Sequence, residues 1–161
     1  MTGCQKCGAP LRTVAGKDYF VCDYCTAFHF PPESEEGVRV LGAWTDMSCP
    51  ICRQMLVSAA VDGIPVRHCT KCRGNLIKPL DFRRIVETRR IKSDKLSQLV
   101  PLDKRQLERQ ILCPGCLQPM DVHPYYGPGN AVIDSCGTCA LIWLDQGELK
   151  AIVTAPERKR R

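Results

Sequence analysis

The sequence is poor in aromatic residues and contains no long apolar run. Ten of its 161 residues are aromatic, and 12 of the roughly 71 residues counted as hydrophobic are cysteines, which leaves little material for a large core. No stretch approaches the ~18–20 apolar residues of a membrane span. Residues 1–6 do not begin a secretory signal. These absences argue against a membrane receptor, a secreted scaffold and an enzyme with one large core, and we expect a cytoplasmic protein.

Cysteine is the residue in clear excess. The cysteines form six Cys-x-x-Cys pairs with none left over, and in chain order they make three units of one form, with 14, 16 and 19 residues between the pairs of each unit. A repeat sets the architecture of a chain, so we expect three small modules. The twelve positions are Cys4, Cys7, Cys22, Cys25, Cys49, Cys52, Cys69, Cys72, Cys113, Cys116, Cys136 and Cys139.

The spacing of these pairs is typical of metal thiolate sites. A Cys-x-x-Cys turn, or knuckle, directs two sulfur atoms at one ion, and two knuckles complete the tetrahedron that structural Zn²⁺ prefers. The gaps lie on or beside the ~15–20 residues expected between paired knuckles. We therefore predict three structural zinc ions, which supply folding free energy that modules of this size do not obtain from apolar burial. Four protein sulfurs leave no position for water, so we expect no enzyme.

Other uses of the cysteines stay open at this point. Iron suits the same tetrahedral sulfur ligands. A disulfide framework requires an oxidising compartment, and a thioredoxin-like redox pair requires a βαβ context, neither of which the sequence indicates. Gly8 follows the first knuckle and permits a left-handed backbone. Arg53 and Leu117 stand at the matching places of the other units, so we expect those knuckles to be strained or different in detail.

Each segment between knuckles has the pattern of a β-hairpin. In the second unit, residues 55–61 and 64–68 flank Asp62-Gly63, a favoured two-residue turn. The matching segments are 11–14 with 19–21 and 120–123 with 131–134, and residues 38–44 are expected to add a strand.

Short helices are predicted after the second and third units. Phe82, Ile85 and Val86 form a narrow apolar stripe, and Pro101 makes one unbroken helix from 80 to 112 unfavourable. We expect a second helix over 103–112, with Asp103 as its N-cap and Leu107, Ile111 and Leu112 turned inward. Asp145 and Glu148 have the spacing of a capping box that opens a helix through Val153.

The charge is uneven along the chain, which has a formal net charge of +6. Residues 1–48 sum to −2, residues 49–77 to +3, residues 78–110 to +5 and residues 111–161 to 0. Three sites of four thiolates and one Zn²⁺ would each add −2 and cancel the total, so the high isoelectric point alone does not indicate nucleic-acid binding.

The third unit carries a family resemblance. Its Cys113-Pro114-Gly115-Cys116 knuckle, and the run Cys136-Gly137-Thr138-Cys139-Ala140-Leu141-Ile142-Trp143-Leu144-Asp145-Gln146-Gly147-Glu148-Leu149, resemble the transcription-factor-IIB-type zinc ribbon family of small prokaryotic proteins. The resemblance is closest in 113–153 and weaker in 49–86, which lacks the Trp and the capping box. It implies a zinc ribbon whose ligands are Cys113, Cys116, Cys136 and Cys139, and says little about biochemical activity.

We therefore expect a small, metal-stabilised, mainly β fold of three tandem zinc ribbons with short helices after the second and third. The expected layout is a first ribbon at 1–32, a linker with one strand at 33–48, a second ribbon at 49–78, a basic helical connector at 79–112, a third ribbon with a C-terminal helix at 113–155 and a basic tail at 156–161.

The expected function is that of a non-catalytic adaptor that contacts nucleic acid or transcription machinery. The alternatives are a protein–protein scaffold without nucleic acid and a thiol redox or metal-responsive protein. No membrane and no small-molecule substrate is expected. His29, His68 and His123 are interpreted as surface or strand residues, Trp143 as core, and the single tip acids Asp18 and Asp62 count against catalysis. The candidate partner contacts are Arg83, Arg84, Arg89, Arg90, Tyr125, Tyr126, Arg158, Lys159, Arg160 and Arg161.

Overall fold

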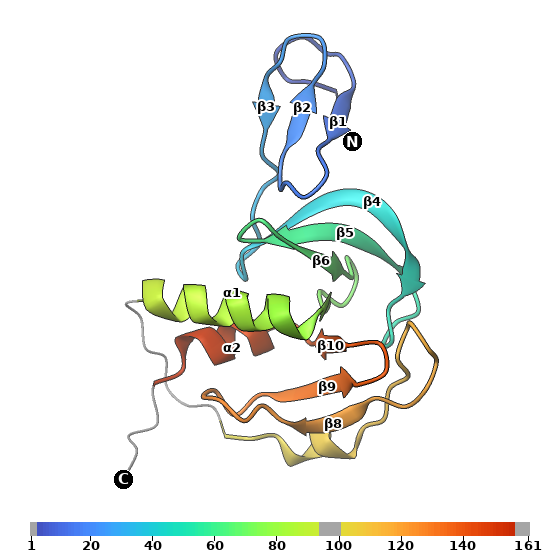
Figure 1. Ribbon diagram of the computed structural model, residues 1–161, viewed down its shortest axis with the longest axis vertical. Coiled ribbons are helices and arrows are strands. Elements are labelled where there is room, and N and C mark those ends of the chain that lie inside the picture. Colours follow the sequence, from blue (N-terminus) through green and yellow to red (C-terminus); the bar gives the residue numbers. More distant parts are fainter. Residues whose placement is uncertain (1–2, 94–100, 157–161) are drawn as a thin grey trace.

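Two antiparallel sheets make up the protein, whose computed structural model describes residues 3–93 and 101–156. The smaller sheet belongs to the first unit and stands apart from the rest (Figure 1). Its strands are β1 (Leu11–Thr13), β2 (Phe20–Cys22) and β3 (Phe28–His29), in that spatial order. The predicted hairpin of this unit is therefore present, with one further short strand beside it.

The larger sheet has seven strands in the order β4-β5-β6-β7-β10-β9-β8. The hairpin predicted in the second unit forms as expected, with Val61 opposite Ile64 across the Asp62-Gly63 turn, whose φ angles are 50° and 77°. The strands are β4 (Val38–Ser48), β5 (Met55–Val61), β6 (Ile64–His68), β7 (Asn75–Ile77), β8 (Asp121–Pro124), β9 (Val132–Cys136) and β10 (Leu141–Leu144).

The second and third units share this sheet, an arrangement that the tandem layout expected from the sequence does not specify. The junction is the antiparallel pair β7–β10, in which Leu76 lies opposite Trp143. Leu76 is four residues after Cys72, and Trp143 is four residues after Cys139, so equivalent positions of the two units face each other. A local two-fold axis therefore passes between these residues, and strands that a lone ribbon would leave at an edge pair with each other.

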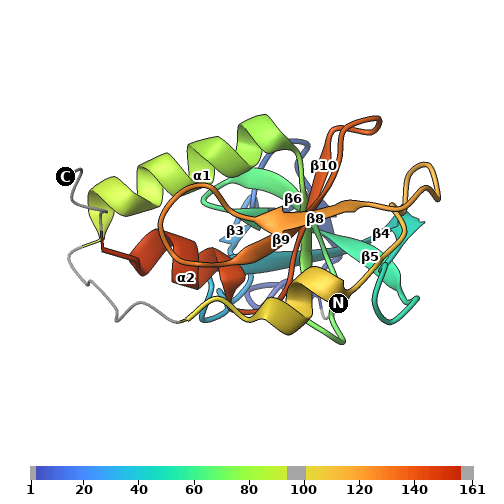
Figure 2. The same cartoon turned by 90° about the horizontal axis from the view of Figure 1, so that it is seen from below.

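Two helices cover one face of the shared sheet and lie side by side (Figure 2). They are α1 (Pro79–Lys92) and α2 (Glu148–Thr154). Phe82, Ile85 and Val86 of α1 are buried, as the apolar stripe predicts, and they join Leu149 and Ile152 of α2 in one core. This core also contains sheet residues from both units, so the scattered apolar residues of the sequence gather into a common interior.

The knuckles of the second and third units lie on the opposite face, around a second core. Trp143 is fully buried there and contacts the cluster that includes Leu56, Leu76 and Met120 together with cysteines from both quartets. The prediction that Trp143 is a core residue is confirmed.

The prediction of a helix over residues 103–112 is wrong. A short 3-10 helix, η1 (Lys104–Glu108), occupies this place, and Asp103 accepts a hydrogen bond from the Arg105 N–H as its N-cap. Ile111 is buried as expected, but Leu112 is 38% exposed. After Glu108 the backbone is extended at Arg109, and the side chain of Arg109 binds Asp134 and Asp145.

Polar contacts attach the segment before β4 to the helices. Arg89 of α1 donates to the carboxylate of Asp62 and to the main-chain oxygens of Glu36 and Gly37. The Gly147 N–H donates to a Glu36 carboxylate oxygen at 2.9 Å. No helix in the described part of the chain is both long and apolar enough to cross a membrane.

Candidate metal centres and the basic surface beside them

The structure gathers the twelve thiols into the three groups that the spacing predicts. In each group the four Sγ atoms lie within 4.8 Å of one another. The Sγ–Sγ distances include 3.5 Å between Cys7 and Cys22, 3.5 Å between Cys49 and Cys72, and 3.6 Å between Cys116 and Cys136. A tetrahedron with metal–sulfur bonds of about 2.3 Å has edges of roughly 3.8 Å. The thiols therefore fit a tetrahedral ion, and all twelve are free of disulfides.

All six knuckles use the same backbone geometry. The residue after each second cysteine has a positive φ: Gly8 75°, Thr26 57°, Arg53 62°, Arg73 61°, Leu117 60° and Ala140 50°. The residues at the Gly8 position of the other units also repeat its main-chain hydrogen bond, from Arg53 N–H to the Cys49 oxygen and from Leu117 N–H to the Cys113 oxygen. Of the two outcomes expected at Arg53 and Leu117, the structure shows the strained backbone and not a different form, since both residues carry a side chain at a left-handed φ where glycine costs least.

Local hydrogen bonds and burial shift the pKa values of the thiols in opposite directions. The Cys25 backbone N–H, the largest influence, lowers the pKa of the Cys22 thiol to about 7. The hydrogen bond with Cys116, followed by burial, raises the pKa of the Cys139 thiol to about 12. Four neighbouring sulfurs therefore do not all ionise unaided, whereas a divalent cation binds them as thiolates and releases their protons.

None of the three histidines completes a quartet. His29 lies on β3, with its Nε2 3.1 Å from Cys4 Sγ, where it orients a cysteine ligand from outside the tetrahedron. His68 is buried and its Nδ1 lies 2.9 Å from Asn75 Oδ1. His123 bonds Ser135 Oγ through Nε2 at 3.0 Å. The interpretation of these residues as strand histidines holds, and the role of His29 beside Cys4 was missed.

The predicted capping box is half formed. A Glu148 carboxylate oxygen accepts from the Asp145 N–H at 2.8 Å, as such a box requires. The Asp145 side chain does not cap the helix; it accepts instead from the Trp143 indole at 2.9 Å and from Arg109. Burial raises the pKa of Glu148 to about 8. Arg109 also binds the fully buried Asp134, so these side chains form one buried polar network.

The arginines of α1 are mostly engaged within the protein. Arg90 donates to the main-chain oxygens of Ile152 and Ala155 at 2.8 and 3.0 Å, which satisfies the end of α2. Arg89 holds Asp62, so this tip carboxylate is also occupied. Arg83 pairs with Glu87 along the exposed side of α1. Of the predicted contacts on this helix, Arg84 alone is exposed without a partner among the described residues, and Arg158–Arg161 lie outside them.

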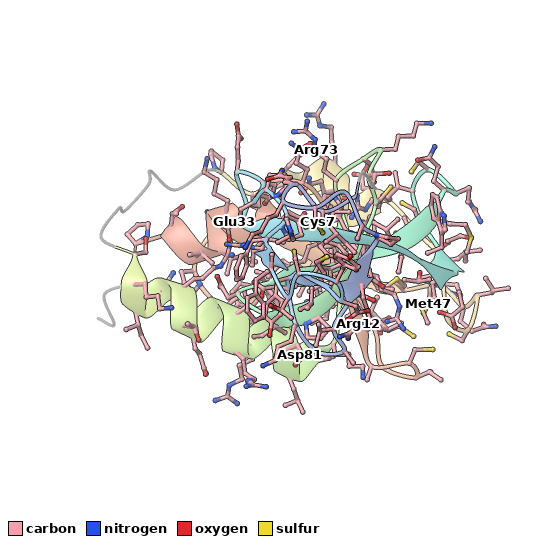
Figure 3. All side chains as sticks on the ribbon, turned by 90° about the horizontal axis from the view of Figure 1, so that it is seen from above. Cys7, Arg12, Glu33, Met47, Arg73 and Asp81 are labelled. Atoms are coloured by element: carbon pink, nitrogen blue, oxygen red, sulfur yellow. The ribbon has the colours of Figure 1, made fainter. Side chains whose placement is uncertain are left out.

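The second unit carries three unpaired cations on its knuckles. Arg53, Lys71 and Arg73 are exposed on its two knuckles, and no described carboxylate lies within ion-pairing distance of them. Arg73 lies at the periphery of the molecule in Figure 3. We call these three side chains the knuckle cations. The signal in the sequence is that an arginine follows the second cysteine of both knuckles in this unit.

The predicted aromatic contacts divide between core and surface. Tyr125 is half-buried and packs edge-on against Phe82, with ring centroids 5.5 Å apart. Tyr126 is 87% exposed and stacks on His123. The sequence reasoning missed the exposed rings of Tyr24 and Phe28 on the first unit and of Trp44 on β4.

One family model matches the chain. Residues 48–88 match a family described as transcription factor zinc-finger, of the transcription-factor-IIB zinc ribbon type. The matched 41 residues cover the second unit and most of α1, whereas the resemblance described above is closer in residues 113–153 of the third unit. This segment is a zinc ribbon of that type, and with the cysteine quartets it makes the chain a zinc-binding protein. No curated protein and no solved structure matches the chain.

Proposed function

We propose that this protein is a non-catalytic adaptor, held in shape by three structural zinc ions, that binds nucleic acid through the knuckle cations. The observation that carries the proposal is the placement of Arg53, Lys71 and Arg73 on one zinc site without a neutralising carboxylate. A thiolate quartet with its zinc contributes −2, and three cations around it reverse the sign of the local charge. Phosphate groups are the natural partners of such a surface.

Each knuckle cation suits a phosphate backbone rather than a single small anion. The three side chains are exposed and spread over both knuckles, so they meet successive phosphates instead of enclosing one. The match of residues 48–88 to a family described as transcription factor zinc-finger adds support. All four sulfurs of each group point at one centre, so the metal is closed to substrate and stabilises the fold.

The test is salt-dependent binding of the zinc-loaded protein to labelled DNA and RNA. We expect the affinity to fall with salt, and the triple variant R53Q/K71Q/R73Q to bind more weakly, with a slope of log K against log salt smaller by up to roughly 0.7–0.9 per lost contact. The matched control is R83Q/R84Q/K92Q, which removes the same charge from α1. Equal losses in both variants, or a flat salt response, would contradict the proposal.

A second candidate function is a protein scaffold, which the first unit favours. Phe28 and Phe30 are 63% and 59% exposed and pack on Tyr19 at 5.3 and 5.4 Å, and Tyr24 is 84% exposed. Aromatic surfaces of this kind mark protein contacts. The redox alternative requires one labile quartet, and thiol titration under mild oxidant tests it: twelve shielded cysteines remove that alternative.

A further inference from the structure

A hollow lies on the knuckle face of the seven-stranded sheet. It has a volume of about 780 Å³ and is bounded by β4, β5, β6 and the end of β7 below and by the β1–β2 turn of the first unit above. Figure 1 shows this turn above β4. The volume falls within the roughly 300–1,000 Å³ of ligand sites. We call this hollow the inter-sheet groove.

The floor of the groove combines small side chains with cations. Ser58, Arg67 and Leu76 stand opposite one another on three adjacent strands and all line the groove. Lys78 follows Leu76 by two residues, so it lies on the same face and is a diagonal neighbour of Arg67. Like charges placed this way repel in the absence of an anion. No described carboxylate lies within ion-pairing distance of either residue.

The walls add one further cation, two carboxylates and an aromatic ring. Lys17 enters from the first unit, while Asp46 and Asp81 also line the groove and leave it with a net charge of +1. Trp44 lines the groove from the edge strand β4 and is 73% exposed, in contrast to the fully buried Trp143. An indole held open beside cations provides a stacking surface for a planar base.

We propose that the inter-sheet groove binds single-stranded nucleic acid, with a base stacked on Trp44 and the backbone phosphates beside Lys17, Arg67 and Lys78. The inference rests on the proposed function and gives it a substrate class. A duplex keeps its bases stacked in pairs and does not offer a face to Trp44, whereas an open strand does. The small side chains Ala43, Ser58 and Ala60 leave room above the sheet for a base. Amino groups of the bases fit beside Asp46 and Asp81.

The test uses the zinc-loaded full chain, ten-nucleotide oligomers of dT and rU, and a 20-base-pair duplex. Since Trp44 is exposed and Trp143 is buried, an added quencher acts on the emission of Trp44 first. We expect the single strands, DNA or RNA, to quench tryptophan emission and the duplex to leave it unchanged. W44F should abolish the quenching and bind nearly as well, and W44A should bind roughly 5- to 150-fold more weakly.

Matched variants separate this proposal from the proposed function. R67Q/K78Q should lower the salt slope for single strands and leave duplex binding as it is. If single strands bind without changing the emission of Trp44, and W44A binds them with unchanged affinity, the proposed binding in the inter-sheet groove is wrong. Nucleic-acid binding by the knuckle cations is not contradicted by that result. The absence of binding to any oligomer would overturn both. Quenching of Trp44 by a ten-residue oligoglutamate with equal affinity would assign the groove to an acidic protein segment and overturn the nucleic-acid proposal.

Discussion

Leu76 and Trp143 face each other across the β7–β10 pair, and each is the fourth residue after the last cysteine of its own unit. The equivalence continues into the helices: Phe82 and Leu149 are each ten residues after that cysteine, and both are buried in the same core. The second and third units are thus two copies of one ribbon joined about a local two-fold axis. A shared interior gives both units more apolar burial than either ribbon has alone.

The close approach at this axis makes Gly74 sensitive to substitution. A Cβ atom built on Gly74 collides with the Trp143 indole, which is fully buried and has no room to move. We expect G74A to destabilise the protein by about 1–3 kcal/mol, as overpacking of a core does. Thermal unfolding of the zinc-loaded protein measures this. G137A is the matched control, since a Cβ there meets no atom within 4 Å, and an equal loss in both variants would refute the explanation.

The local elements were predictable from the sequence, and their assembly was not. The Asp62-Gly63 turn and the alternating residues around it indicate β5 and β6, and the cysteine spacing indicates the quartets. The pairing of β7 with β10 joins residues 65–69 positions apart in the chain, and a strand as short as Asn75–Ile77 carries no sequence signal that identifies its partner strand. Arg89 and Arg90 were likewise predicted to contact a partner from a basic surface. The sequence does not show the main-chain carbonyl oxygens to which they donate hydrogen bonds.

Replacing a left-handed residue after a knuckle by glycine is expected to stabilise the protein. Leu117 has φ 60° and is 67% exposed, so its side chain adds little packing to offset the backbone strain. We expect L117G to stabilise the zinc-loaded protein by about 0.5–1 kcal/mol, which for a chain of this size raises Tm by roughly 1–4 °C. L117A keeps the strain without the side chain and serves as control. A gain in L117A as large as in L117G would show that backbone strain is not the cause.

Arg109 neutralises a buried charge and is expected to be indispensable. It binds Asp145 and the fully buried Asp134, and its own pKa, which burial alone would lower, is raised by the two carboxylates. R109Q leaves the carboxylate of Asp134 buried without a cation, which costs about 3–5 kcal/mol. The double variant R109Q/D134N should recover much of this loss. Denaturant unfolding of the four proteins of the cycle measures the coupling, and additive losses would contradict it.

Glu148 makes stability depend on pH. Burial raises its folded pKa to about 8 from an ordinary 4.5, so the folded protein holds a proton that the unfolded chain has lost. Its stabilising contribution is complete below the unfolded pKa and is lost as the pH rises through 8, by about 2 kcal/mol between pH 6 and pH 8. E148Q keeps a neutral acceptor for the Asp145 N–H. The difference in unfolding free energy between E148Q and the parent should therefore grow with pH, and a constant difference would refute this assignment.

Loss of one zinc ligand should have effects that spread through the shared core of the second and third units but stay local in the first unit. C52S removes a sulfur from the quartet whose cysteines Cys49 and Cys69 lie in the same core as Trp143, Leu141 and Cys136 of the third unit. C7S removes an exposed sulfur from a quartet that contributes to neither core cluster. We expect each variant to lose one zinc by elemental analysis. Amide hydrogen exchange should accelerate in β9 and β10 for C52S and stay confined to residues 3–32 for C7S. Three ribbons that merely follow one another in the chain would confine each effect to its own unit, because zinc binding and folding would then be coupled ribbon by ribbon.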